Sequence, residues 1–149
     1  MIVVRQVNRR FPIGFGLQLL KLIQATYEAS GGVLGSRLGH LRFLLLRTRG
    51  RRSGRIRTAC LTYLEDGRNY VVVGSKGGSD SQPAWFLNLS ADPDVDVQVG
   101  RRRFTARARL ARGAERERLW REVNRIWDYA GYQSRTEREI PVVVLEPSR

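Results

Sequence analysis

Between residues 43 and 145 the chain alternates short apolar stretches with glycine-containing turns, and this pattern limits the possible folds more than any other feature. The stretches carry apolar residues in a short run or at every second position, which is typical of β-strands. Asp66-Gly67 and Gly100-Arg101 separate neighbouring stretches as hairpin turns do. Six short strands joined mostly by hairpins indicate an antiparallel, barrel-like sheet of the α+β class. The predicted strands are 43–46, 56–64, 70–73, 95–99, 104–110 and 140–145.

Three segments have helical periodicity instead. Residues 83–89 begin with proline, and residues 119–127 place apolar side chains on one face of an amphipathic helix. The third segment, from Pro12 to Ala29, is an apolar helix followed by two glycines. It either packs against the domain, lies on a membrane surface or closes over a ligand. With 149 residues the chain fits one domain, residues 1–149, in which about the first 40 residues form a helical leader.

Arginine supplies nearly all of the positive charge. The formal net charge is +13, and only Lys21 and Lys76 are lysines. Seven arginines lie between residues 42 and 57, and six more lie between residues 101 and 112. Arginine-rich codon usage would scatter such residues over the surface. Clusters suit an anionic partner, because the guanidinium fork matches phosphate and carboxylate oxygens. Both explanations stay open at this point.

The remaining residue types exclude several kinds of site. Cys60 is the only cysteine and His40 the only histidine, which excludes an intramolecular disulfide and the usual zinc sites, so we expect no metal. Cys60 lies in an alternating strand pattern, where a small buried apolar residue is expected. The apolar stretch from Phe15 to Ile23 lacks a cleavage site and is too short to span a bilayer. The expected location is the cytoplasm, with peripheral membrane contact through the 12–29 helix as an alternative.

Two glycine-rich turns could hold an anion. Gly50-Arg51-Arg52-Ser53-Gly54 places two arginines and a serine at a hairpin tip, where glycines alone would be enough for the turn. Lys76-Gly77-Gly78 offers backbone amides and an ammonium group. Either turn alone is weak evidence of binding. The chain also lacks a convincing nucleophile and base pair, because Ser53 and Ser134 have no histidine nearby and the carboxylates of 115–122 are expected on a solvated helix face.

The two turns occur in a fixed order with two further runs. Together LLRTRGRRSG (45–54), SKGG (75–78), PAWFLNLSADP (83–93) and YQSRTEREIP (132–141) resemble the deazaflavin (coenzyme F420)-dependent nitroreductase family. The resemblance extends from about residue 43 to residue 147, and the first forty residues match only as a helical leader. It implies a split β-barrel with flanking helices that binds coenzyme F420, a deazaflavin with a phosphate and an oligoglutamate tail.

The resemblance also implies an activity. The protein would be an F420H2-dependent reductase that transfers hydride to a small organic acceptor, such as a quinone, a nitro compound or an enone. The cofactor supplies the hydride, and the protein supplies binding, orientation and polarisation. A homodimer is one expected assembly.

Roles for single residues follow from the same resemblance. The cofactor's phosphate and tail would meet Arg51, Arg52, Ser53 and Gly54. The rest of the cofactor would be lined by Ser75, Lys76, Gly77, Gly78, Pro83 and Trp85. Tyr129 and Tyr132 would lie on the acceptor side, where a tyrosine with a pKa of about 10 can donate to the oxygen on which charge develops. Ser75 is the alternative proton donor.

Three positions depart from the family pattern. Arg52 stands where lysine is common, Phe86 where tyrosine is common and Arg135 where an aromatic residue is common. The first two keep charge or shape, whereas Arg135 places a cation beside the acceptor and favours an acidic substrate.

Three other functions stay open: an FMN-binding split-barrel protein, a storage protein for the deazaflavin and a basic nucleic-acid-binding domain. The last is disfavoured, because Trp85, Trp120 and Trp127 are not interleaved with arginines as stacking platforms would be, and we expect no nucleic-acid partner.

Overall fold

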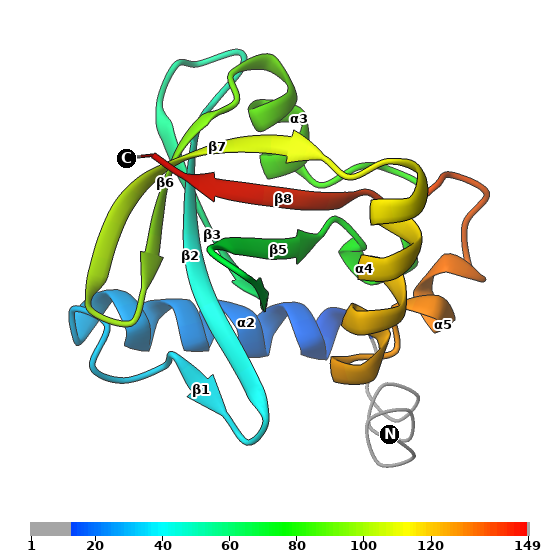
Figure 1. Ribbon diagram of the computed structural model, residues 1–149. Coiled ribbons are helices and arrows are strands. Elements are labelled where there is room, and N and C mark those ends of the chain that lie inside the picture. The colour runs from blue at the N-terminus through cyan, green and yellow to red at the C-terminus, as the bar shows by residue number, and fades with distance from the viewer. Residues whose placement is uncertain (1–12, 149) are drawn as a thin grey trace.

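The computed structural model describes residues 13–148, and in its first helix the side chains from residue 18 onward (Figure 1). The helices are α2 (Ile13–Ala29), the 3-10 turn η1 (Lys76–Gly78), α3 (Ala84–Ala91), α4 (Gly113–Ile126) and α5 (Tyr129–Gln133). The strands are β1 (Arg37–Leu38), β2 (Leu41–Arg49), β3 (Ile56–Thr62), β4 (Leu64–Asp66), β5 (Asn69–Val73), β6 (Asp94–Val99), β7 (Arg102–Leu110) and β8 (Val142–Pro147).

These eight strands form one antiparallel sheet across the described residues. Its order is β1-β2-β6-β7-β8-β5-β4, and β3 also pairs with β2. The α+β class is confirmed, but the predicted number of six strands is wrong. β1 has only two residues, too few for a pattern, and β4 continues the alternation of β3 after an interruption at Tyr63. The last strand also begins two residues later than predicted, at Val142.

The sheet curls because its two ends are neighbours in sequence. β3 pairs with β2 on one side, while β4 pairs with β5 on the far side of the strand order. Only Tyr63 separates β3 from β4, so the sheet must turn back on itself. The result is a curled, split-barrel-like sheet (Figure 1).

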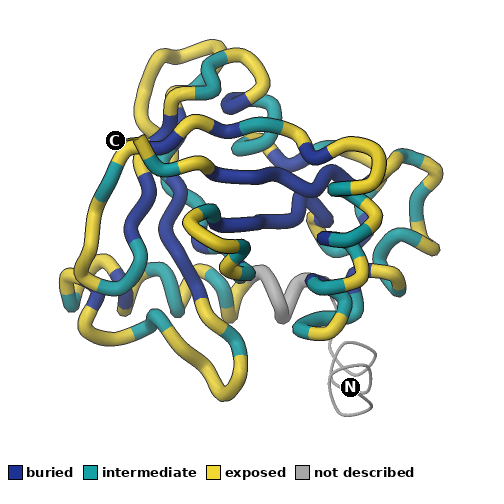
Figure 2. Tube along the Cα trace, viewed as in Figure 1, coloured by how far each residue is buried: buried dark blue, intermediate teal, exposed yellow. Residues whose placement is uncertain are grey.

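Continuous apolar runs occur where a strand is covered on both faces. In β2, Leu44 and Leu46 face the barrel interior, while Phe43 and Leu45 pack in a separate cluster with Tyr27 of α2. All five residues are buried, and Figure 2 shows the buried strands as the centre of the molecule. β8 repeats the arrangement with α4 on its outer face. A strand covered on both faces loses the polar alternation of a half-exposed strand.

α2 contributes to the core through its C-terminal half. Tyr27 is 0% exposed, and its hydroxyl lies 3.3 Å from the Phe43 carbonyl oxygen and 3.2 Å from that of Gln98. The same hydroxyl accepts the backbone N–H of Gly100. Leu22 on this helix is nevertheless 64% exposed. The helix therefore packs against the domain, which was one of its three expected positions. It also keeps an apolar residue, Leu22, at the surface.

Two smaller expectations have different outcomes. Cys60 is buried, as predicted, and burial raises the pKa of its thiol to about 12. Pro12, the predicted helix start, lies outside the described residues. Among the helices of residues 13–148, none is long and apolar enough to cross a membrane.

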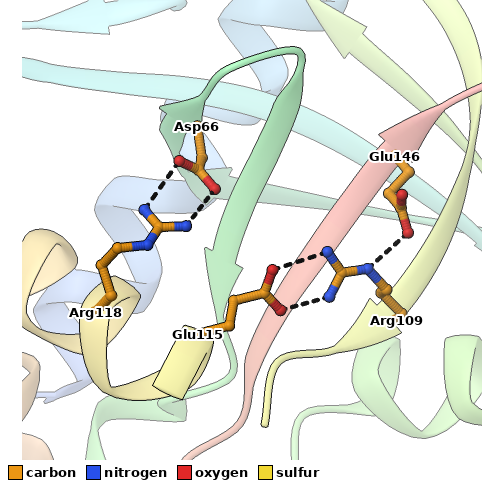
Figure 3. A network of polar contacts seen from close by, with 5 residues as sticks. All are labelled: Asp66, Arg109, Glu115, Arg118 and Glu146. Atoms are coloured by element: carbon orange, nitrogen blue, oxygen red, sulfur yellow. Dashed lines mark hydrogen bonds and ion pairs between the residues drawn. The ribbon is translucent and has the colours of Figure 1, made fainter. Parts of the chain in front are cut away.

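Ion pairs fix α4 to the strands beneath it (Figure 3). Arg118 donates to both carboxylate oxygens of Asp66, each at 3.0 Å. Arg109 of β7 donates to Glu115 at 2.5 and 2.9 Å and to Glu146 of β8 at 2.6 Å. These bonds hold the pKa of Asp66 and the pKa of Glu115 below their usual values. On the expected solvated face of α4, Glu115 and Glu122 are partly exposed and also form ion pairs.

Candidate functional site

The turn between β2 and β3 carries the first group of predicted cofactor residues. Residues 50–55 lie beyond the last pair of the β2–β3 ladder. Gly50 donates to the Arg55 carbonyl at 2.7 Å, and Gly54, with a φ of +71°, donates back to the Gly50 carbonyl at 2.8 Å. Ser53 Oγ accepts the backbone N–H of Arg55 at 3.2 Å. The turn is therefore closed by its own backbone, and its three arginines, Arg51, Arg52 and Arg55, are exposed.

Asn88 of α3 fastens this turn to the barrel. Its side chain is buried, and Oδ1 accepts the backbone N–H of Arg51 at 3.1 Å and a guanidinium N–H of Arg51 at 3.4 Å. Its Nδ2 donates to the buried Thr48 hydroxyl at 3.2 Å. The sequence analysis assigned no role to Asn88. An asparagine between the apolar positions Leu87 and Leu89 of a short helix was the available signal.

The arginines of this turn, Arg51, Arg52 and Arg55, are here called the turn arginines. All three are exposed, and none forms an ion pair with a carboxylate in residues 13–148. A phosphate and a chain of glutamates need such cations, because an arginine already paired would have to break that pair to bind. The donor set thus fits the polyanionic part of coenzyme F420.

The second group lies in the loop from Gly74 to Ser79, which contains η1. Lys76, Gly77 and Gly78 follow one another with φ values of +44°, +65° and +83°. Lys76 is the one non-glycine residue with positive φ in the described chain. Such a conformation costs on the order of 1–3 kcal/mol at a residue with a side chain, so neighbouring contacts must hold it. Lys76 Nζ donates to Ser81 Oγ at 3.0 Å, which keeps the ammonium group near the loop.

The loop packs directly on α5. A Cβ atom added at Gly78 would lie 2.6 Å from the Tyr132 carbonyl oxygen, so only glycine fits between them. Ser75 is 9% exposed at the start of η1, and Pro83 is buried at the start of α3. Trp85 follows, half-buried against the barrel core. The structure therefore groups the predicted loop residues with α5, and α3 connects this group to the turn arginines.

The two candidate tyrosines have different surroundings. Tyr129 is 7% exposed, its hydroxyl lies 2.6 Å from Thr62 Oγ1, and burial raises its pKa to about 12. Tyr132 is half-buried, and its hydroxyl oxygen accepts the indole N–H of Trp127 at 3.2 Å. Burial raises the pKa of Tyr132, and the bond from Trp127 opposes that shift. Both hydroxyls are therefore protonated at neutral pH, and Tyr132 is the more accessible of the two.

Arg135 lies across the end of this group. Its guanidinium carbon is 5.6 Å from the centre of the Tyr132 ring, and Nη1 is 3.5 Å from the Gly77 carbonyl oxygen. A cavity of about 560 Å³ adjoins it, beside the loop and separate from the turn arginines. That cavity is lined by Asp80, Ser134, Arg135, Thr136, Glu137 and Arg138.

Gln133 and Arg138 are two further residues that the sequence analysis quoted without assigning a role. Gln133 donates to the Arg138 carbonyl at 2.7 Å and accepts the N–H of Ile140 at 2.9 Å, which fixes the segment before β8. The Arg138 side chain reaches the 74–79 loop. Partial burial lowers the pKa of Arg138, and the nearby carboxylate of Asp80 opposes the shift.

Comparison with known families and sequences gives one consistent result. The model of the F420H(2)-dependent quinone reductase family matches residues 19–147. An F420H(2)-dependent quinone reductase of Mycobacterium tuberculosis is 45% identical over 135 residues, which are 87% of this chain and 91% of that protein. A homologue in Mycobacterium bovis has the same identity and coverage.

Solved structures agree with the sequence comparison. An F420-H2 dependent reductase, FDR-A, is 38% identical with a TM-score of 0.65, and the match covers 70% of this chain and 93% of that one. A protein described as a domain-swapped dimer is 32% identical with a TM-score of 0.68, and the match covers 88% of this chain and 99% of that one. A protein of Listeria innocua described as a pyridoxamine 5'-phosphate oxidase, 15% identical with a TM-score of 0.52 over 88% of this chain and 94% of that one, shares the fold alone.

Proposed function

The chain belongs to the F420H(2)-dependent quinone reductase family, and from this premise we propose that it transfers hydride from reduced coenzyme F420 to a quinone or a related small organic acceptor. The observation that carries the proposal is the set of turn arginines without carboxylate partners in the described chain. They supply cations where a phosphate and an oligoglutamate tail would need them. The order of the four sequence runs supports the same conclusion.

Two groups of residues would hold the cofactor. Arg51, Arg52, Ser53 and Gly54 would bind the phosphate and tail, and Asn88 would keep Arg51 in place. The remaining contacts would come from Ser75, Lys76, Gly77, Gly78, Pro83 and Trp85. When bound, reduced F420 supplies a hydride in a single two-electron step. The chain's own contribution is to orient the ring, to neutralise the tail and to donate a hydrogen bond on the acceptor side.

Tyr132 is the residue we propose at the acceptor. A quinone or enone gains negative charge on oxygen when it receives hydride, and a hydroxyl fixed at that point stabilises the transition state more than the ground state. Tyr132 is protonated at neutral pH and lies on α5, which packs on the 74–79 loop. Tyr129 is buried against Thr62, which supports a packing role for that residue. Ser75 remains the alternative proton donor.

Assembly and location are also proposals. The chain would act as one split-barrel domain with its N-terminal segment as a leader, and a homodimer is consistent with the relative described as a domain-swapped dimer. In the leader, Leu22, Val33 and Leu34 are each at least 60% exposed, which would suit peripheral membrane contact of a cytoplasmic protein. Vesicle co-sedimentation with and without anionic lipid tests this contact.

The central experiment measures cofactor binding and turnover in the whole chain. Purified protein is titrated with F420 by fluorescence, with FMN as the competing cofactor, and F420H2 oxidation is then followed after a quinone is added. We expect saturable F420 binding that weakens with added salt, no comparable binding of FMN, and oxidation that depends on the quinone. Preference for FMN would overturn the proposal, and F420 binding without oxidation by any acceptor would favour a storage protein.

A further inference from the structure

Arg138 connects the segment before β8 to both ends of the 74–79 loop. Its guanidinium donates to the Gly74 carbonyl at 3.2 Å and to the Ser75 carbonyl at 2.9 Å, ahead of η1. It also donates to the Ser79 carbonyl at 2.7 Å and to the Gln82 side-chain oxygen at 2.9 Å, beyond η1. One planar group therefore joins the start of the loop to its end. Lysine could not reproduce this arrangement, because it lacks the rigid fork of donors.

The loop needs contacts of this kind. Its centre has positive φ at Lys76 as well as at two glycines, a conformation that a free chain adopts rarely. Gln133 in turn holds the backbone of Arg138 at 2.7 Å, so the donor itself is fixed. α5 packs on the loop at Gly78, from one side. The four bonds from Arg138 reach residues on both sides of η1, so they join the two ends of the loop through one side chain.

We propose that Arg138 is a positioning residue for the cofactor: it holds the 74–79 loop in its binding conformation before the cofactor arrives. This inference rests on the proposed function, because the loop is the part of the chain that would line F420. A ligand's apparent affinity falls in proportion to the fraction of protein in the competent conformation. Loss of Arg138 therefore weakens cofactor binding without removing any group that touches the cofactor or the acceptor.

The test begins with cofactor-free protein. In Arg138→Ala, backbone amides of residues 75–79 should exchange hydrogen at least tenfold faster than in the wild type, while the 50–55 turn is unchanged. The Kd for F420 and the KM for F420H2 should rise roughly tenfold to a hundredfold. The kcat at saturating F420H2 should stay within about threefold, because the bound cofactor restores the loop. The KM for the quinone should not change.

Two variants serve as controls. Arg138→Lys keeps the charge and should recover part of the affinity. Arg118→Ala removes bonds to Asp66 and Glu122 that lie away from the loop, so it should lower the melting temperature and leave the KM for F420H2 unchanged. A general loss of stability would give both alanine variants the same kinetic pattern.

Each outcome decides the proposal. A fall in kcat with unchanged KM and unchanged exchange at 75–79 would overturn it, since Arg138 would then only support the fold. If Arg138→Ala does not fold, the KM shift must be present in Arg138→Lys, and its absence there overturns the proposal as well. If the wild type does not bind F420, the proposed function fails, and the exchange experiment still shows whether Arg138 holds the loop.

Discussion

Two groups of arginines in this molecule differ in their partners. Arg107, Arg109, Arg116 and Arg118, here called the paired arginines, each form an ion pair with a carboxylate at 3.2 Å or less. The turn arginines form none with the carboxylates of residues 13–148. The 50–57 segment has no acidic residue, whereas Glu115, Glu117 and Glu122 lie beside Arg116 and Arg118 in the sequence. The difference therefore comes partly from the sequence itself and partly from where the fold places Asp66, Asp94, Glu139 and Glu146.

In a chain with a net charge of +13, this difference in partners would set the proposed anion site apart from the other arginines. Asp66 of β4, Glu115 of α4 and Glu146 of β8 neutralise Arg109 and Arg118, while Asp94 and Glu139 pair with Arg107 and Arg116. A ligand phosphate cannot displace such a pair without leaving a carboxylate unpaired. At the 50–55 turn no such competition arises. We therefore propose the unpaired turn arginines, rather than the paired arginines, as the anion site.

The largest expected effect separates chemistry from binding. Tyr132→Phe should lower kcat/KM for a quinone by roughly a hundredfold, the scale seen when one donor to a developing oxyanion is lost. The Kd for F420 should be nearly unchanged, which is the opposite of what is expected for the turn arginines. Stopped-flow oxidation of F420H2 by the quinone measures the change in rate, with Tyr129→Phe as the matched variant. If the Tyr132→Phe protein reacts at the wild-type rate, the Tyr132 hydroxyl does not take part in the reaction and the side chain only lines the site. The proton would then come from Ser75 or from water.

The second effect tests the comparison directly. Arg51→Ala or Arg52→Ala should raise the Kd for F420 roughly tenfold to a hundredfold, because a hydrogen bond to a charged group contributes about 1.5–3 kcal/mol. Arg107→Ala removes an arginine that is also exposed but is paired with Asp94, and it should leave the Kd unchanged. Fluorescence titration at two salt concentrations measures all three. Equal losses in the three variants would mean that general positive charge, and not the unpaired state of the turn arginines, attracts the cofactor.

The third effect concerns stability. Arg109→Ala should destabilise the fold by about 1 kcal/mol, since three charged hydrogen bonds are lost but water already screens this partly exposed group. Cofactor affinity should be unaffected. Thermal unfolding of the cofactor-free protein measures the change.

The same variant has a predictable pH dependence. Arg109 holds the pKa of Glu115 below its usual 4.5, so the folded state binds that proton less readily than the unfolded state does. The stabilisation is therefore present above about pH 4.5 and is lost as the pH falls through the lowered pKa. The gap in melting temperature between the wild type and Arg109→Ala should narrow below pH 4. A gap that stays constant down to pH 3 would show that Glu115 is not the titrating partner.

Local sequence patterns predicted much of the fold and marked one turn of the candidate site. Alternation and short apolar runs located six of the strands, and glycines with arginines marked the 50–54 turn. Two-residue β1 had no pattern to detect, and β4 continued the alternation of β3 across Tyr63. β1 was missed because it is too short to show a pattern, and β4 was missed because its pattern is the same as that of β3.

The residues that sequence reasoning missed depend on tertiary contacts. Asn88 bonds to Arg51 across 37 positions of sequence, and Arg138 bonds to Ser75 across 63. Neither residue type is unusual in its own segment, because a surface arginine and a helical asparagine are ordinary features. Their contacts become visible only in the folded chain, which brings the turn to α3 and the segment before β8 to the 74–79 loop.

The smallest expected effect concerns Arg135, which belongs to neither group of arginines. It forms no ion pair with a carboxylate in the described chain, yet its guanidinium is 5.6 Å from the Tyr132 ring, on the proposed acceptor side. An exposed charge there interacts with a bound anion through water, so its contribution is about 0.2–1 kcal/mol, and Arg135→Ala should lower kcat/KM for a sulfonated quinone by roughly threefold. The value for the uncharged parent quinone should not fall, and higher salt should narrow the difference between the two acceptors in the wild type. Steady-state assays with both quinones at two ionic strengths measure this. Equal losses for both acceptors would show that Arg135 acts by packing on Tyr132 and Gly77, and that the charge comparison does not extend to the acceptor side.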